Sequence, residues 1–426
     1  MDPNLRQDII RLIKREVVPA LGCTEPAAVS LCVAKASEIL GSIPEKIEVA
    51  LSGNMLKNAM GVGIPGTGMI GLPIAIALGA LIGKSEYGLE VLRDVNPLHV
   101  EHGKDYISED RIKITHIPQA PSILHIDVTC RAGNHSSRAV ISESHTNFIL
   151  LEKDGETIFS REGFHSSNSN EERDPELNLR LVYDFATTAP LSEIDFILEA
   201  KRLNKAAALL ALQNSYGHSL GFIMKTKGAS LFGESPLTHI ISYTSAACDA
   251  RMGGAQIPVM SNSGSGNQGI CATMPVVSYA EDCGANEKTL ARALILSHLT
   301  SIYIKQSLGR LSALCGCVVA STGASSGIVY LMGGGYKEVA YAVKNMIANI
   351  TGMICDGAKP SCSLKISSGA GTALMSAMLA MEGRCVSEAE GIISDDVDQS
   401  IRNLTSIGRD AMQATDHLVL HIMTHK

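Results

Sequence analysis

The sequence predicts an α+β protein: a largely helical domain formed by both ends of the chain, with an inserted α+β domain that contains an antiparallel sheet. Apolar residues recur at three- and four-residue spacing in 7–18 and 27–40, which indicates helices. Between 94 and 160 the period shifts towards two, and alanine-rich helical sequence returns near Ile194. We therefore expect the helical domain over 1–90 and 190–426 and the inserted domain over 91–189.

The expected elements follow the same patterns. The segments with strand-like alternation are RIKITHI, SILHIDVTC, SSRAVISES and NFILLEKDGETIFS, in which Asp154-Gly155 favours a hairpin turn. The polar stretch at 165–176 is expected to be an exposed connection. The apolar run from Ile70 to Gly83 has 14 residues, whereas a bilayer needs about 20, so we predict a buried core helix there.

Composition excludes several classes of protein. The 426 residues carry 43 acidic and 36 basic side chains, a net charge of −7, without a Lys/Arg-rich run that could follow a phosphate backbone. Nucleic acid is therefore not expected as a partner, and neither is a membrane. The charged N-terminus lacks the pattern of a signal peptide, which predicts a cytoplasmic protein. In that reducing compartment the 11 cysteines are expected to serve burial, metal binding or catalysis instead of disulfides.

Two glycine-rich loops are candidates for anion binding. GVGIPG at 61–66 satisfies G-x-G-x-x-G, but Pro65 interrupts the turn and Glu86 lies in a polar turn, so we reject a dinucleotide site. SNSGSGNQGIC at 261–271 is richer in polar groups. Its amides, with Asn267 and Gln268, suit a small carboxylate at the start of a helix, and a tight interhelical turn is the alternative.

The same loop resembles the asparagine loop of one class of pyridoxal-phosphate eliminases. Such an enzyme needs a lysine for the Schiff base, and Lys225 and Lys227 precede the loop. The flanking sequence lacks the alternating strands and helices of that fold. A pyridoxal-phosphate β-eliminase therefore remains one alternative.

Cys355 and Cys362 lie on either side of a Gly-Pro turn. Structural zinc sites favour cysteines two to four residues apart, whereas this pair is separated by six, so zinc fits badly. An iron–sulfur cluster draws thiolates from separate loops. Three thiols would leave one iron open as a Lewis acid, as a hydro-lyase needs.

Six segments, ALGCTEP (20–26), PGTGMIGLP (65–73), DARMGG (249–254), SNSGSGNQG (261–269), RLSALC (310–315) and MICDGAKPSC (353–362), together resemble the L-cysteine desulfidases. That family is similar to the iron–sulfur L-serine dehydratases. The resemblance implies an oxygen-sensitive 4Fe-4S enzyme that converts L-cysteine to pyruvate, ammonia and hydrogen sulfide. By motif, the cluster ligands are Cys315, Cys355 and Cys362. Cys317 is the alternative to Cys315.

The resemblance also implies roles for residues outside the cluster. Cys23 precedes Thr24-Glu25-Pro26, a helix-start pattern, so we expect the helix dipole to lower the pKa of its thiol, with Glu25 opposing. In the desulfidase pattern Cys23 resembles the base that removes the substrate α-proton. Packing alone is the other interpretation of this thiol, and Cys32 is assigned to the core. The expected substrate contacts, which could instead brace loops, are Thr24, Asn54, Asn58, Arg251, Asn267 and Gln268, with Lys57 as a further candidate.

Three functions thus stand: an iron–sulfur cysteine lyase, a pyridoxal-phosphate eliminase, and a non-catalytic cluster or small-molecule sensor. L-Serine remains an alternative substrate to L-cysteine because both leaving groups suit one geometry. The expected assembly is a homodimer. His417, His421 and His425 share one face of a terminal helix, which we interpret as a favourable helix C-terminus instead of a metal site.

Overall fold

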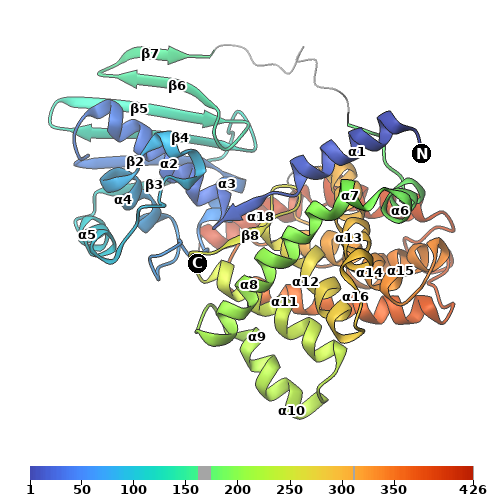
Figure 1. Cartoon of the computed structure of the whole chain (residues 1–426). Helices are drawn as coiled ribbons and strands as arrows, with labels where there is room; N and C mark the ends of the chain where they lie inside the picture. The colour runs from blue at the N-terminus through green and yellow to red at the C-terminus, as the bar shows by residue number, and fades with distance from the viewer. Residues whose placement is uncertain (162–173, 310–311, 426) are drawn as a thin grey trace.

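The computed structural model describes residues 1–161, 174–309 and 312–425. Figure 1 shows two parts, a six-stranded sheet with its covering helices and a larger bundle of helices. The first helix of the chain belongs to the bundle, whose other helices begin at Leu179. The predicted α+β class is confirmed. Of the expected exposed connection at 165–176, residues 165–173 lie outside the described part, as do 310 and 311 of the RLSALC motif.

The sheet has the strand order β3-β2-β4-β5-β6-β7. Its strands are β2 (Lys46–Ser52), β3 (Ile112–Ile117), β4 (His125–Ala132), β5 (His135–Ser142), β6 (Phe148–Lys153) and β7 (Glu156–Ser160). β2 and β3 run parallel, whereas the other neighbours are antiparallel. Asp154 and Gly155 join β6 to β7 with φ of 51° and 84°, which fits the predicted tight hairpin.

Strand β2 begins well before residue 91, where the inserted domain was expected to start. Its burial alternates, with Ile47, Val49 and Leu51 completely buried, as a half-buried strand requires. The sequence KIEVALS itself alternates polar and apolar residues, so the local pattern favours a strand here. The sheet therefore includes a strand from the range 1–90, which was expected to belong to the helical domain.

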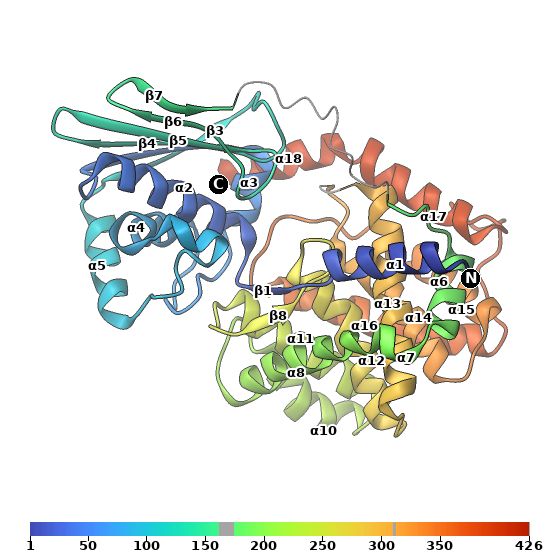
Figure 2. The same ribbon diagram turned by 45° about the horizontal axis from the view of Figure 1, so that its top comes forward.

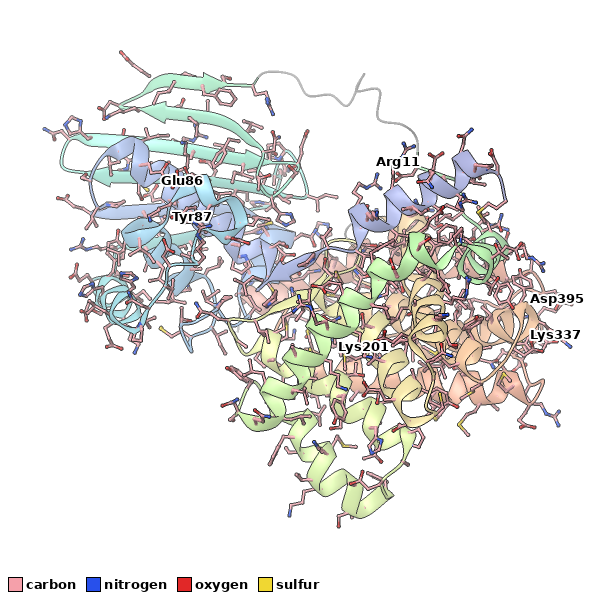
Figure 3. All side chains as sticks on the ribbon, viewed as in Figure 1. Arg11, Glu86, Tyr87, Lys201, Lys337 and Asp395 are labelled. Atoms are coloured by element: carbon pink, nitrogen blue, oxygen red, sulfur yellow. The ribbon has the colours of Figure 1, made fainter. Side chains whose placement is uncertain are left out.

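Helices pack on this sheet and close its core. They are α2 (Thr24–Leu40), α3 (Gly53–Ala59), α4 (Leu72–Ile82) and α5 (Pro97–Ser108), with a short 3-10 helix η1 (Ser85–Glu90). The apolar α4 is buried along most of its length, which confirms the predicted core helix. Cys32 is also in this core, as expected, and its thiol donates to the carbonyl of Ala139. Glu86 and Tyr87 lie on η1 (Figure 3), and Glu86 is exposed.

The larger part is a bundle in which small residues allow close helix packing. Its helices are α1 (Pro3–Glu16), α6 (Leu179–Thr188), α7 (Leu191–Ile194), α8 (Leu198–Gln213), α9 (Leu220–Ile223), α10 (Ala229–Phe232), α11 (Pro236–Met252), α12 (Gly266–Asp282), α13 (Glu287–Leu308), α14 (Gly316–Leu331), α15 (Tyr336–Ile350), α16 (Cys362–Met381), α17 (Val397–Ser406) and α18 (Gln413–Thr424), with short turns η2 (Asp195–Ile197), η3 (Met224–Gly228) and η4 (Ile407–Ala411). A Cβ at Gly323 of α14 would lie 2.2 Å from the carbonyl oxygen of Ser297 on α13, so only glycine fits this contact.

Two segments connect the parts besides the chain crossings. β1 (Pro19–Leu21) pairs with β8 (Pro258–Met260) as a two-stranded antiparallel ribbon. The red helix α18 leaves the bundle and ends beside α3 (Figure 2). Among the described residues, no helix combines the length and apolar character needed to cross a bilayer.

Candidate active site

A cavity of about 1270 Å³ lies where the sheet part meets the bundle. α1 and α3, the loops that flank β4 and β5, and the starts of several bundle helices contribute to its wall. The residues to which the sequence analysis assigned roles all line it, namely Cys23, Thr24, Asn54, Asn58, Arg251, Asn267, Gln268, Cys315, Cys355 and Cys362. The further candidate Lys57 and the alternative ligand Cys317 line it as well. The structure thus brings together residues that are up to 339 positions apart, while their individual roles stay predictions.

Four helices begin at this cavity. Cys23 and Cys315 are the N-cap residues of α2 and α14, Ser265 is that of α12, and Cys362 is the first residue of α16. Within the described part of the chain, α12 alone of these four has a side-chain cap, from Ser265. In α16 the N–H groups of Cys362, Ser363 and Leu364 donate to carbonyls of the preceding turn. The positive ends of four helix dipoles therefore face one space, which favours negatively charged ligands.

Cys23 occupies the predicted helix start, but its electrostatics differ from the prediction. The thiol is 3% exposed, and burial raises its pKa to about 12. Arg251 opposes this shift, whereas Glu25 and Cys362 reinforce it. The expected lowering of the pKa is therefore wrong, because desolvation of a thiolate outweighs the helix dipole. Cys23 is a neutral thiol in this site.

Arg251 links Cys23 to the SNSGSGNQG loop. Its Nη2 donates to the carbonyl oxygen of Gly22 at 3.0 Å, and its Nη1 donates to Oδ1 of Asn267 at 2.9 Å. Gly266 permits this arrangement, since a Cβ there would lie 2.2 Å from Nε of Arg251. Nε itself has no hydrogen-bond partner among the described residues. The guanidinium is thus held in place with one buried donor still available.

Side chains of α12 and α13 hold the loop that follows β8. Asn262 Nδ2 lies 3.1 Å from Nδ1 of His298, whose Nε2 lies 3.0 Å from Oγ1 of Thr273. Burial lowers the pKa of His298 to about 3, so the imidazole is neutral. Gly269 packs so tightly that a Cβ would lie 1.9 Å from the carbonyl oxygen of Met260. The backbone N–H groups of the loop are therefore held in one orientation.

A polar cluster of Thr24, Glu25 and Asn58 also lines the cavity. Nδ2 of Asn58 donates to Oε1 of Glu25 at 3.2 Å, and Oγ1 of Thr24 donates to Oε2 of the same carboxylate, also at 3.2 Å. Two predicted substrate residues therefore hold the Glu25 side chain from both sides. Asn54 lines the cavity from α3.

A short antiparallel β-bridge joins Leu314 and Ile354, the residues directly before two of the predicted ligands, Cys315 and Cys355. The N–H of Cys315 donates to the carbonyl of Met353 at 3.0 Å, and that of Cys355 donates to Ala313 at 2.6 Å.

Gly357, with φ of 91°, then turns the chain towards Cys362 at the start of α16. Burial raises the pKa of Cys362 to about 11, with a further contribution from the charges of Cys315 and Cys355. The three thiols therefore act on one another's charge, while their role as ligands stays a prediction.

Cys317 is positioned differently from Cys315. Its Sγ lies 3.7 Å from Sγ of Cys271 and 3.1 Å from the carbonyl oxygen of Lys365, to which it donates. The Cys315 thiol is also in contact with the Cys317 side chain, so both sulfurs have protein partners. Both thiols line the cavity, and the choice of Cys315 over Cys317 as ligand stays a prediction.

Lysines that the sequence analysis did not single out also line the cavity. Burial lowers the pKa of Lys305 to about 8, and the charge of Cys355 opposes this shift. Nζ of Lys365 donates to the carbonyl of Ile354 at 2.8 Å and pairs with Asp356. Both lysines sit within helices, where no spacing distinguishes them from surface lysines. They place positive charge beside the thiols.

Other candidates lie elsewhere. Lys225 and Lys227 are exposed on η3 and do not line the cavity, so neither is placed to serve a pyridoxal phosphate bound there. His417, His421 and His425 are exposed on and just after α18. Within the described ranges, no group of three or more His, Cys, Asp or Glu side chains is arranged to hold a single metal ion.

With this fold and site, the chain belongs to the family described as serine dehydratase alpha chain, whose pattern matches residues 86–421. That family implies a lyase or dehydratase. Cys23, Thr24, Asn54 and Asn58 precede the matched segment.

Among its relatives, the UPF0597 proteins of Bacteroides fragilis strain ATCC 25285 and of Bacteroides thetaiotaomicron are each 63% identical, over 427 and 425 residues. These alignments cover 100% of both chains in the first case, and 99% of this chain and 98% of the relative in the second. The UPF0597 protein of Shewanella halifaxensis is 45% identical over 438 residues, with 100% of both chains covered.

Proposed function

We propose that this protein is an L-cysteine desulfidase, which converts L-cysteine to pyruvate, ammonia and hydrogen sulfide. The observation that carries the proposal is that Cys23 lines the same cavity as Cys315, Cys355 and Cys362. The related dehydratases that the sequence resembles have a histidine in the motif position of Cys23. A thiol at that position is what the desulfidase pattern leads us to expect.

The donor set fits a 4Fe-4S cluster. Three thiols lie in one cavity but, among the described residues, do not form a compact site for a single ion, whereas the thiolates of a cluster bind separate irons. Burial and mutual repulsion raise the pKa of Cys362, so the thiolate form needs a positive partner. When bound, the cluster would supply an open iron that acts as a Lewis acid towards substrate oxygen or sulfur.

The residues of the chain would then bind the substrate and move its proton. Arg251 and the N-terminus of α12 suit the α-carboxylate, because both present buried N–H donors to the cavity. Cys23, as thiolate, would accept the α-proton, and the C–S electron pair would leave with sulfide. The resulting aminoacrylate tautomerises and adds water to form pyruvate and ammonia.

The raised pKa of Cys23 means that its thiol is protonated before this step. A neutral thiol cannot accept a proton, so Cys23 must first lose its own. Arg251 is the group of this chain that lowers the pKa of Cys23 most strongly. We therefore assign Arg251 a second task, stabilisation of the Cys23 thiolate, besides carboxylate binding.

L-Serine dehydration is the second candidate, favoured by the description of the matched family. It uses the same proton transfer and the same carboxylate contacts, and differs in the leaving group. Direct competition between the two amino acids distinguishes these candidates.

The test uses protein purified without oxygen. We expect about four iron and four acid-labile sulfide per chain and a visible band that dithionite bleaches. L-Cysteine should yield pyruvate and sulfide in equal amounts, with kcat/KM well above that for L-serine. Preference for L-serine would replace the proposal by the second candidate, and a borohydride-reducible cofactor or absence of iron after anaerobic reconstitution would refute both.

A further inference from the structure

The helix α18 places the acidic side chain of Asp416 against α3, the helix that carries Asn54 and Asn58 at the edge of the cavity. α18 leaves η4 and lies beside α3 (Figure 2), where Asp416 forms an ion pair with Lys57. Lys57 is 3% exposed and Asp416 is 23% exposed, so this pair is largely shielded from water. A shielded pair is sensitive to loss of one partner, because the other charge is left buried.

The same helix also completes the core of the sheet part. Leu420, one turn after Asp416, is buried in the cluster that contains residues of α2, β2 and β4. Among the described residues, it is the one buried member of this core that follows Ile141 in the chain. Gly53 at the start of α3 receives it, since a Cβ there would lie 2.6 Å from Cδ2 of Leu420. α18 is therefore attached to α3 at two points.

Lys57 connects this attachment to the loop of the predicted cluster ligands. Its carbonyl oxygen lies so close to Gly357 that a Cβ at Gly357 would be 2.1 Å away. Its ammonium charge also lowers the pKa of Cys355, against the effect of burial. Lys57 lies between Asn54 and Asn58 on α3, both of which line the cavity. Lys57 thus contacts α18 and the loop that carries Cys355, and it lies on the same helix as Asn54 and Asn58.

We propose that Asp416 is a positioning residue for the substrate site. Through Lys57 it sets α3, and with it Asn54 and Asn58, at a defined distance from the loop that carries Cys355. Lys57, which also lines the cavity, is accordingly a bridge between helices besides being a candidate substrate contact. The effect on substrate binding rests on the proposed function, whereas the effect on α3 does not.

The test compares Asp416→Asn, which removes the charge, with Asp416→Glu, which keeps it. In Asp416→Asn we expect amide hydrogen exchange over residues 53–59 to be about tenfold faster. The KM for L-cysteine should rise about tenfold while kcat changes little, because binding geometry is affected and not the proton transfer. Asp416→Glu should restore most of both properties. The matched control is Asp410→Asn, which breaks the exposed pair of Asp410 with Arg409.

Iron content per chain serves as a check on folding, because correctly folded Asp416→Asn should contain as much iron as the wild type. If Asp416→Asn fails to fold, Leu420→Ala tests the second attachment with the same exchange measurement. Unchanged exchange in residues 53–59 with unchanged KM would overturn the inference. If the wild type does not turn over L-cysteine, the proposed function fails, but faster exchange in α3 of Asp416→Asn, restored by Asp416→Glu, still establishes the positioning of α3.

Discussion

Arg251 donates a hydrogen bond to the carbonyl oxygen of Gly22, the residue directly before Cys23. The contact joins the DARMGG and ALGCTEP motifs, which lie 229 residues apart. It also brings a permanent positive charge to a buried thiol whose pKa burial raises to about 12. The position of this guanidinium therefore controls both the geometry and the protonation of the predicted base.

Replacement of Arg251 by lysine should separate charge from shape. The variant Arg251→Lys would keep a positive charge, but its side chain cannot donate to Gly22 and Asn267 at once, because an ammonium lacks the planar fork. We expect kcat/KM for L-cysteine to fall about 10²-fold with iron content unchanged. Arg409→Lys, at an exposed pair, is the control. Full activity in Arg251→Lys would show that the fork is dispensable.

Cys23→Ala tests the predicted base. Cys23 is absent from the predicted ligand set, so the variant should keep its full iron content and still bind L-cysteine. Turnover should fall by about 10²- to 10⁴-fold, as is typical on loss of a general base, and exchange of the substrate α-proton with solvent should cease. Iron loss would instead identify Cys23 as a ligand, and retained activity would place the base elsewhere.

The ligand assignment is tested by a matched pair of cysteine variants. Cys315→Ser should lose iron and activity together, as should Cys355→Ser and Cys362→Ser. Cys317→Ser should keep most of both, because its thiol is engaged with Cys271 and the carbonyl of Lys365. Iron and acid-labile sulfide per chain are the measurements. The reverse result for Cys315 and Cys317 would exchange their roles.

Gly357→Ala should disturb the thiol loop through its backbone. Gly357 has φ of 91°, and an added Cβ would lie 2.1 Å from the carbonyl oxygen of Lys57. Strain of this kind costs about 1–3 kcal/mol, and relief by loop movement should reduce iron content. Gly352→Ala, where a Cβ would meet nothing within 4 Å, is the control in the same loop. Equal iron in the two variants would contradict this account.

His298 predicts a pH dependence of stability. Its pKa is lowered to about 3 in the fold from an ordinary 6.5, so below pH 6.5 the unfolded chain binds a proton that the folded chain does not. The free energy of unfolding should therefore fall as pH decreases from 6.5 towards 3, by about 1.4 kcal/mol per pH unit from this residue.

A leucine side chain does not titrate. In His298→Leu, the free energy of unfolding measured in urea should therefore fall less steeply with decreasing pH than in the wild type. The comparison is between slopes, because His298→Leu also loses the hydrogen bonds to Asn262 and Thr273 and starts from lower stability. Equal slopes would mean that His298 is already protonated in the folded protein.

Much of this arrangement could be predicted from local patterns. The spacing of apolar residues was sufficient for α2 and α4, and the Asp154-Gly155 pair was sufficient for the β6–β7 hairpin. The motifs also identified residues that share one cavity, because glycine-rich turns and helix starts are recognised from residues that are adjacent in the sequence.

The remainder depends on contacts between distant residues. Nothing near Asp416 indicates that it meets Lys57, 359 positions earlier. The pKa of Cys23 was predicted in the wrong direction because local sequence shows the helix start but not the burial that outweighs it. Lys305 and Lys365 were overlooked for the same reason: a lysine acquires its function from the thiols that the fold places beside it.

The attachment of Leu420 to the sheet core has a consequence for biosynthesis. Residues 24–160 leave the ribosome well before α18, so the nascent sheet part exposes the surface beside Gly53 until α18 has been made. The core of the sheet part is thus completed by a residue that is made long after the other buried members of that core. We expect ribosome-bound chains that lack α18 to be cleaved within α3 by a protease that spares the released protein.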